Sequence, residues 1–249
     1  MLLADGAVHI WTAHQPLTTG PDLEVVLSSA ERDKARRFQF TNHRLAYVFA
    51  HAVLRDVLSR YLQCTPLDIR FCENPFGKPR LADAVSGVIP EFNMSHAGDL
   101  VLIALSYGRR IGVDVEKIRP TDDFSVIAES HFTPAESAFL FRHAPADRAR
   151  AFFRCWTRKE AYIKALGKGL SIPLNSFDTL IDGGRSGRRV AGIPDGPDVA
   201  NWWLEDLGAP ENYMAAVAVE TRIDRLVYFE WQQQGGTSTL GPAESRNPR

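Results

Sequence analysis

Cysteine is scarce in this sequence, and neither sign of charge is in excess. Cys64, Cys72 and Cys155 are odd in number and follow neither a metal-ligand nor a redox spacing, so we expect three reduced thiols and no disulfide framework. The 29 basic and 30 acidic side chains give a formal net charge of −1, so no overall field draws the chain to nucleic acid or to a membrane surface. Any affinity for an anionic ligand must come from a local group of cations.

Long apolar runs are absent as well. No segment approaches the roughly 18 consecutive apolar residues of a membrane span, and residues 1–14 carry no basic leader ahead of an apolar stretch. We therefore expect a cytoplasmic protein. The chain does have length and apolar content, because 249 residues, 45% of them hydrophobic, can build an ordinary core in one large domain or two small ones.

The apolar pattern is that of a mixed α/β (α+β) chain. Apolar residues recur at three- and four-residue intervals from Arg44 to Leu62, which predicts an amphipathic helix. Two more helices are expected at residues 29–38, with Ser29 as the cap, and at 147–166, where Gly167 suits the C-terminal end. Strands are expected at 7–12, 69–71, 101–106, 111–116, 177–181, 200–205, 213–220 and 226–231.

The two halves of the chain share one coarse order: a long helix, a turn containing Gly-Lys, and an apolar strand. The turns hold Gly77-Lys78 and Gly167-Lys168, and the strands are 101–106 and 213–219. This order indicates an internal duplication with a cleft between subdomains 1–110 and 111–232, and a duplicated chain of this length is expected to be monomeric. Residues 182–197 predict a loop or loose hairpin, and 233–249 have the composition of a disordered tail.

The strand Gly112-Val113-Asp114-Val115-Glu116 places two carboxylates on one face, because side chains alternate along a strand. Like charges so placed repel each other unless a cation lies between them, and oxygen ligands suit Mg²⁺. The alternative is a solvated strand with two surface acids.

On the later helix, Trp156, Glu160 and Lys164 fall four residues apart and share one face. Glu160 and Lys164 could be a surface ion pair, with Trp156 in the core. A third group, Lys78 and Arg80 in a tight turn followed by Ser95-His96, would suit phosphate, although such a histidine is often structural.

Together these segments resemble the Sfp-type 4′-phosphopantetheinyl transferases, over about residues 29–180. The motifs are Gly77-Lys78-Pro79, Asn93-Met94-Ser95-His96, Gly112 to Glu116, Trp156 to Lys164, and Gly167-Lys168-Gly169. The resemblance implies a pseudo-twofold protein of two similar subdomains that binds coenzyme A in the cleft between them. It also implies transfer of the phosphopantetheine arm to a serine of an apo acyl, peptidyl or polyketide carrier protein, with release of 3′,5′-ADP.

By the same resemblance, Asp114, Glu116 and Glu160 would hold one Mg²⁺ that also binds the diphosphate of coenzyme A. Glu160 is the family's candidate base, although a metal-bound water is an alternative because a carboxylate on a cation is a weak base. Lys164 would contact the diphosphate and help 3′,5′-ADP depart, with Lys159 as its companion.

The resemblance also implies a set of phosphate contacts. Lys78, Ser95, His96 and Arg44 would hold the adenosine 3′-phosphate and nearby oxygens. Residues 34–37 supply three further cations, Lys34, Arg36 and Arg37, although Glu31 falls where some relatives have lysine. Glu136 matches an acid that recurs in relatives, or is a first-turn acid favoured by the helix dipole.

Two other functions stay open at this point. An inactive relative could bind coenzyme A or a carrier without transfer. A different Mg²⁺-dependent phosphoryl or nucleotidyl transferase could share the acids alone, although the sequence has no Gly-x-x-x-x-Gly-Lys-Ser/Thr loop. Residues 117–131, with Phe124, Val126 and Ile127, are expected to form a carrier-facing loop, and no motif identifies the carrier.

Overall fold

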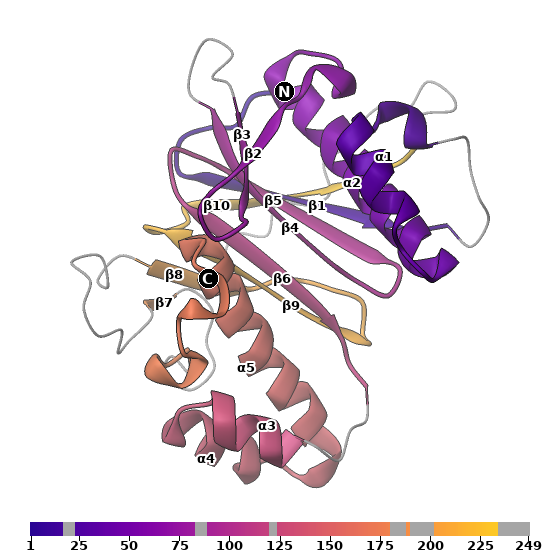
Figure 1. The fold of residues 1–249 in the computed structure, drawn as a ribbon. Coiled ribbons are helices and arrows are strands. Elements are labelled where there is room, and N and C mark those ends of the chain that lie inside the picture. Colours follow the sequence, from indigo (N-terminus) through magenta and orange to yellow (C-terminus); the bar gives the residue numbers. More distant parts are fainter. Residues whose placement is uncertain (17–22, 83–88, 120–123, 180–187, 190–201, 234–249) are drawn as a thin grey trace.

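The computed structural model describes residues 1–16, 23–82, 89–119, 124–179, 188–189 and 202–233 (Figure 1). The expected tail beyond residue 233 and most of the expected loop at 182–197 lie outside the described residues. Two four-stranded sheets lie between two long helices, and this arrangement confirms the mixed α/β class.

The first sheet has the order β10-β1-β5-β4, formed by Arg225–Glu230, Ala7–His14, Leu100–Tyr107 and Pro90–Ala97. The long helix α2 (Thr41–Leu62) covers one face of this sheet. Val53 and Val57 of α2 belong to the same buried cluster as Trp11, Ile103 and Leu105 of the strands. The apolar face of α2 thus packs on the sheet face to which every second side chain of the strands points.

The second sheet has the order β6-β9-β8-β7, formed by Ile111–Lys117, Tyr213–Glu220, Trp202–Asp206 and Arg188–Arg189. The helix α5 (Pro145–Leu166) covers it and packs Tyr162 against Trp202 and Phe177. As expected, α5 ends at Gly167, which has φ 68° and donates its N–H to the carbonyls of Ile163 and Lys164.

The two sheets share a core on the faces that α2 and α5 leave uncovered. Val8 and Leu102 of the first sheet lie in one buried cluster with Val113, Val115 and Val217 of the second. The layers therefore run α2, first sheet, second sheet, α5. Because Val113 and Val115 point into the shared core, the alternate residues Gly112, Asp114 and Glu116 face α5.

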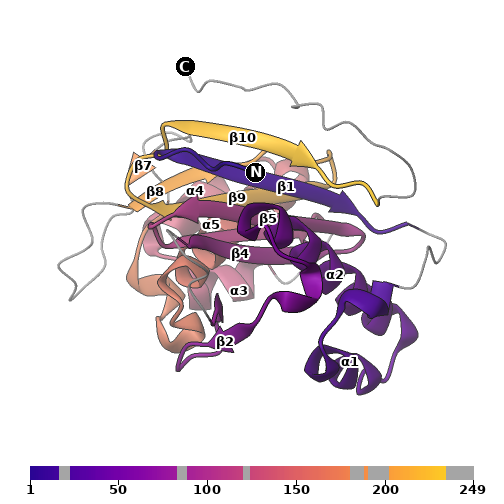
Figure 2. The same ribbon diagram turned by 90° about the horizontal axis from the view of Figure 1, so that it is seen from above.

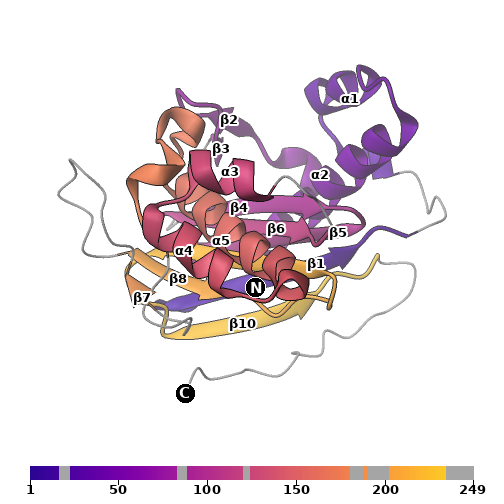
Figure 3. The same ribbon diagram turned by 90° about the horizontal axis from the view of Figure 1, so that it is seen from below.

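The two sheets have partly similar strand orders. In each half a 22-residue helix follows the first strand, and the last strand lies at the centre, β5 between β1 and β4 and β9 between β6 and β8. The subdomain boundary expected at 110/111 stays a prediction, and β10 (Arg225–Glu230) crosses it. That strand comes from the second half yet pairs in parallel with β1 (Figures 2 and 3), and Trp231 after it donates to Asp56 of α2 at 2.7 Å.

Several short elements differ from the sequence predictions. α1 (Ser29–Arg36) is capped by Ser28 instead of Ser29, because Ser28 and Glu31 form a capping box. Two helices that were not predicted, α3 (Phe124–His131) and α4 (Pro134–Arg142), pack beside α5 (Figure 3). The strand expected at 69–71 is β2 (Phe71–Glu73), paired with β3 (Pro79–Leu81). Residues 177–179 of the strand expected at 177–181 form no strand.

Single helical turns fill the connections. They are η1 (Leu23–Val26), η2 (Pro66–Asp68), η3 (Gly169–Ser171) and η4 (Leu174–Ser176). Cys64, Cys72 and Cys155 are free thiols, as predicted. Within the described segments, no helix combines the length and the apolar character that a bilayer crossing requires.

Candidate functional site

The glycine of the acid strand lets helix and sheet approach closely. A Cβ atom on Gly112 would overlap the carbonyl oxygen of Ala161 and the amide nitrogen of Ala165, and would lie 2.9 Å from the Cα of Ala165. Only a hydrogen fits between β6 and α5 at this point. The close approach brings Glu160 and Lys164, on the same stretch of α5, beside Asp114.

We expect Gly112→Ala to destabilise the protein by about 1–3 kcal/mol, because backbone atoms on both sides leave no room for a methyl group. The shift of α5 should also lower the rate of the transfer reaction that the sequence resemblance implies. Urea unfolding measures the first effect and a transfer assay the second. Gly208→Ala is the matched control, since a Cβ there meets no atom within 4 Å. Equal stability of the two variants would contradict this packing argument.

Side chains of β4 join the two halves along the free edge of β6. Oδ1 of Asn93 accepts the backbone N–H of Val113 at 2.9 Å, and Oγ of Ser95 accepts that of Val115 at 3.3 Å. Residue 93 of β4 thus faces residue 113 of β6, and residue 95 faces residue 115. Two polar side chains take the place of the backbone hydrogen bonds that would join two paired strands. The Asn-x-Ser pair therefore has a structural role that its sequence resemblance did not reveal.

Asp114 lies at the centre of the polar contacts on this face. Its Oδ1 accepts from Lys164 Nζ at 2.6 Å and from Ser95 Oγ at 2.9 Å, and Lys164 also donates to Ser95 Oγ at 3.1 Å. Among the described residues, Oδ2 of Asp114 is buried and accepts no hydrogen bond. A buried, unpartnered carboxylate oxygen is unfavourable unless a cation or a donor from a ligand completes it.

The three predicted metal ligands influence one another electrostatically. Burial raises the pKa of Asp114, against the opposing charge of Lys164. Burial and then the negative charge of Asp114 raise the pKa of Glu116 and of Glu160. In the described part of the chain, no three His, Cys, Asp or Glu side chains are grouped as they would be around a metal ion. The carboxylates therefore share one electrostatic neighbourhood, and their side chains would have to turn toward a common ion.

Two histidines, His51 and His96, lie on the neighbouring α2 side of the site. His96 of β4 has its pKa lowered by partial burial and by the positive charges of His51 and Lys164. The ring of His51, which was not predicted, lies 4.0 Å from that of Tyr47 at a tilt of 33°, and His51 contacts Glu31 Oε1 at 3.4 Å. The sequence did offer a signal for His51: it follows Arg44 by seven residues, which places both side chains on the same face of the helix.

Lys78 joins the halves instead of standing free as a phosphate contact. Its ammonium donates to the carbonyls of Ile111 at 2.9 Å and Ala165 at 3.2 Å, and Asn74 Nδ2 donates to Gly167 O at 2.6 Å. Burial lowers the pKa of Lys78 to about 8. Two of its three N–H groups are thus used, one at the start of β6 and one at the C-terminal end of α5.

Arg44 and Glu31 lie outside the group around Asp114. Arg44, exposed in the first turn of α2, forms an ion pair with Glu24 at 2.6 Å. Glu31 closes the cap of α1 and forms an ion pair with the buried Arg55 at 2.7 Å. The acid at position 31 therefore has a structural partner of its own.

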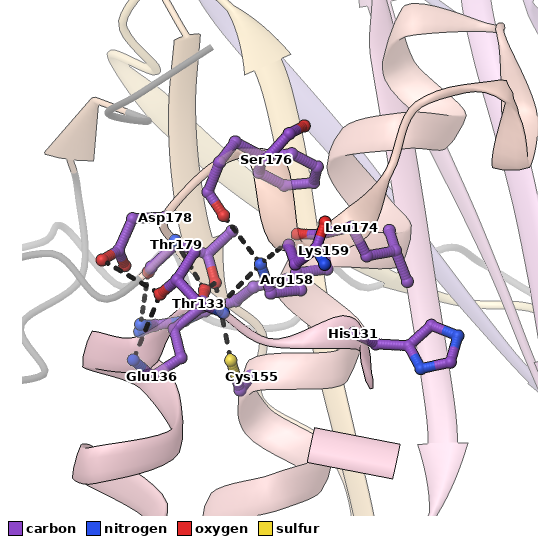
Figure 4. Close-up of polar contacts among 12 residues, drawn as sticks. His131, Thr133, Glu136, Cys155, Arg158, Lys159, Leu174, Ser176, Asp178 and Thr179 are labelled. Carbon is purple, nitrogen blue, oxygen red and sulfur yellow. Dashed lines mark hydrogen bonds and ion pairs between the residues drawn. The ribbon is translucent and has the colours of Figure 1, made fainter. Parts of the chain in front are cut away.

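Lys159 does not face the site, and this corrects the expectation that it accompanies Lys164. Its side chain is fully buried, with Nζ donating to the carbonyls of Leu174 and Phe177 and pairing with Glu136 Oε2 at 2.6 Å. Glu136 is also buried, caps α4 and accepts from Thr179 N and Oγ1 (Figure 4). Lys159 and Glu136 thus fasten α5 to α4 and to the segment that contains η4.

The expected carrier-facing loop is largely a helix. Residues 120–123 lie outside the described residues, and α3 follows from Phe124. The ring of Phe124 packs on Phe152 at 4.7 Å and Ile127 joins the same apolar cluster, whereas Val126 is exposed. One of the three apolar side chains named for this segment is therefore available to a partner.

Known proteins resemble this chain over both halves. A family model described as 4′-phosphopantetheinyl transferase, N-terminal, matches residues 21–107, and one described as the 4′-phosphopantetheinyl transferase superfamily matches residues 110–218. The chain is 37% identical over 222 residues to 4′-phosphopantetheinyl transferase HetI of Nostoc sp., covering 88% of this chain and 89% of HetI. It is 32% identical over 169 residues to 4′-phosphopantetheinyl transferase Sfp of Bacillus subtilis, covering 68% and 72% of the two chains. Together with the arrangement around Asp114, these matches confirm the resemblance: the chain belongs to the 4′-phosphopantetheinyl transferase superfamily.

Proposed function

We propose that this protein transfers the 4′-phosphopantetheine arm of coenzyme A to a serine of an apo carrier protein, with Mg²⁺ held by Asp114, Glu116 and Glu160. The observation that carries the proposal is the buried Oδ2 of Asp114, which accepts no hydrogen bond from the described residues. It lies on a face with two further carboxylates whose pKa values are raised by burial and by the charge of Asp114. An oxygen-only donor set with surplus negative charge fits Mg²⁺.

Mg²⁺ bound there would neutralise the diphosphate and stabilise the charge that develops as the P–O bond breaks. Lys164, with its side chain 31% exposed, can turn from Asp114 toward the diphosphate and stabilise the departing 3′,5′-ADP. His96, whose lowered pKa favours the neutral imidazole, can donate a ring N–H to phosphate oxygens at the α2 side of the site. Lys78 and Ser95 hold the walls of the site in register, and Arg44 can reach a phosphate by leaving Glu24.

In the proposed reaction the serine Oγ bonds to the β-phosphorus, the P–O bond to 3′,5′-ADP breaks, and the serine proton passes to Glu160. Glu160 is partly exposed, and burial together with the charge of Asp114 raises its pKa in the metal-free protein, whereas Mg²⁺ on the same carboxylate would lower it and weaken the base. A water molecule in the same place is the alternative acceptor.

The direct test is a mass measurement. The full chain is incubated with coenzyme A, Mg²⁺ and an apo acyl carrier protein, with a peptidyl carrier domain in a parallel reaction. A mass gain of one phosphopantetheine group on the carrier, absent when its acceptor serine is replaced by alanine, supports the proposal. Binding of coenzyme A without a mass gain on either carrier would instead indicate a binding protein.

Metal dependence should vary with pH. Because the pKa values of Asp114, Glu116 and Glu160 are all raised, protons compete with the metal above the usual carboxyl range. We therefore expect the Mg²⁺ concentration for half-maximal rate to increase as the pH falls from 8 to 6. Titrations of Mg²⁺ against transfer rate, with calorimetric Mg²⁺ binding alongside, check this. A half-maximal concentration independent of pH would argue against carboxylate ligands.

A further inference from the structure

Residues 36–45 form ten consecutive exposed positions at the corner where α1 meets α2 (Figures 2 and 3). We call this stretch the 36–45 segment. It contains no acidic residue and carries Arg36, Arg37 and Arg44 together with His43. Three large apolar side chains stand among these cations: Phe40 is 58% exposed, Leu45 37% and Phe38 36%. A surface that is both basic and apolar is unusual for a stretch that contacts only water.

The aromatic side chains of this segment have local supports. The ring of Phe38 lies 5.3 Å from that of Tyr47, and the ring of Phe40 meets His43 edge-on at 5.5 Å. Phe40 is also the N-cap residue of α2, where its side chain makes no capping hydrogen bond. Side chains held in this way lose little conformational entropy when a partner covers them.

Ring contacts lead from the segment along α2 toward the candidate site. The ring of Phe38 contacts that of Tyr47, the ring of Tyr47 lies 4.0 Å from that of His51 at a tilt, and the charge of His51 lowers the pKa of His96. His96 in turn lies in the field of Lys164, which binds Asp114. A macromolecule that covers the 36–45 segment therefore lies at the α2 side of the candidate site.

We infer that the 36–45 segment docks the apo carrier domain through a carrier surface that presents acidic and apolar side chains next to its acceptor serine. This inference rests on the proposed function. Arginines alone could serve the phosphates of coenzyme A, but Phe38, Phe40 and Leu45 require a partner with apolar surface. A second copy of the chain fits poorly, because a symmetric contact would place two acid-free, basic segments against each other.

Phe40→Glu tests the inference in the full chain, with any apo carrier that the wild type modifies as the probe. We expect the KM for the carrier to increase about tenfold, because the change removes a central apolar contact and adds a repelling charge. The kcat and the KM for coenzyme A should not change. Leu67→Glu is the matched control, since Leu67 of η2 is also 58% exposed but lies outside the segment. Circular dichroism and thermal melting establish that both variants fold.

Charge provides a second measurement. Arg37 has no ion pair among the described residues, so Arg37→Glu should raise the KM for the carrier and weaken its dependence on salt concentration. Binding of a carrier whose acceptor serine is replaced by alanine, followed by fluorescence anisotropy, should weaken in parallel.

An unchanged KM for the carrier in Phe40→Glu, or equal effects in Leu67→Glu, would overturn the docking inference and leave the transferase function intact. A change confined to the KM for coenzyme A would overturn it as well, because the segment would then serve the cofactor. If the wild type modifies no carrier, the proposed function itself fails. Dimerisation of the wild type that Phe40→Glu abolishes would assign the surface to a second copy.

Discussion

Asp114→Asn should reduce the transfer rate by about a thousandfold or more while the protein stays folded. Asparagine has the size of aspartate and keeps an oxygen for Ser95 and Lys164, but it removes the negative charge that the metal and Lys164 both need. Since burial raises the pKa of Asp114, the neutral side chain is tolerated in the fold. We expect the free energy of unfolding to change by less than about 1 kcal/mol.

Three measurements define this result: transfer rate by mass spectrometry, unfolding in urea, and Mg²⁺ binding by calorimetry in the presence of coenzyme A. Asp33→Asn makes the same chemical change at an exposed surface ion pair with Arg36 and should behave as the wild type. More than a tenth of the wild-type rate in Asp114→Asn would remove Asp114 from the metal site.

The second large effect concerns stability. Lys159→Met should lower the free energy of unfolding by about 3–5 kcal/mol, because it leaves the fully buried Glu136 without its cation. Glu136→Gln should also destabilise the protein, because it leaves the buried ammonium of Lys159 without its carboxylate. In the double variant Lys159→Met/Glu136→Gln no uncompensated charge remains, so its loss should be smaller than the sum of the single losses.

Urea unfolding of the four proteins measures the coupling energy between Lys159 and Glu136. Lys168→Met, at an exposed position just beyond α5, is the control for replacing a lysine by methionine. Kinetics separate the structural role of Lys159 from the coenzyme A contact that the sequence resemblance implied. If Lys159→Met is as stable as the wild type but has a KM for coenzyme A raised tenfold, Lys159 contacts the cofactor and does not serve as a buried structural ion pair.

The local part of the site followed from periodicity. Alternation along β6 and the 3.6-residue repeat of α5 were enough to place Asp114 with Glu116, and Glu160 with Lys164. Lys159 precedes Glu160 by one residue, which rotates it about 100° around the helix and away from that face. Its partner Glu136 depends on how α4 packs, and no local pattern encodes that.

Some of the missing detail did have a local signal. Ser28 with Glu31 and Thr133 with Glu136 both follow the Ser/Thr-x-x-Glu spacing of a capping box, which would have corrected the start of α1 and revealed α4. The contacts of Ser95 and Lys78 had no local signal in the sequence. Both bind backbone groups of residues far along the chain, Val115, Ile111 and Ala165, so their roles emerge only once the halves are assembled.

The parallel pairing of β10 with β1 has a consequence for how the molecule is made. During synthesis the first strand, Ala7–His14, leaves the ribosome more than two hundred residues before Arg225–Glu230 exists to cover its edge. Until then a bare strand edge is open to pairing with other chains. The nascent N-terminal half therefore cannot complete its sheet alone, and a product cut short before residue 225 would be prone to aggregate.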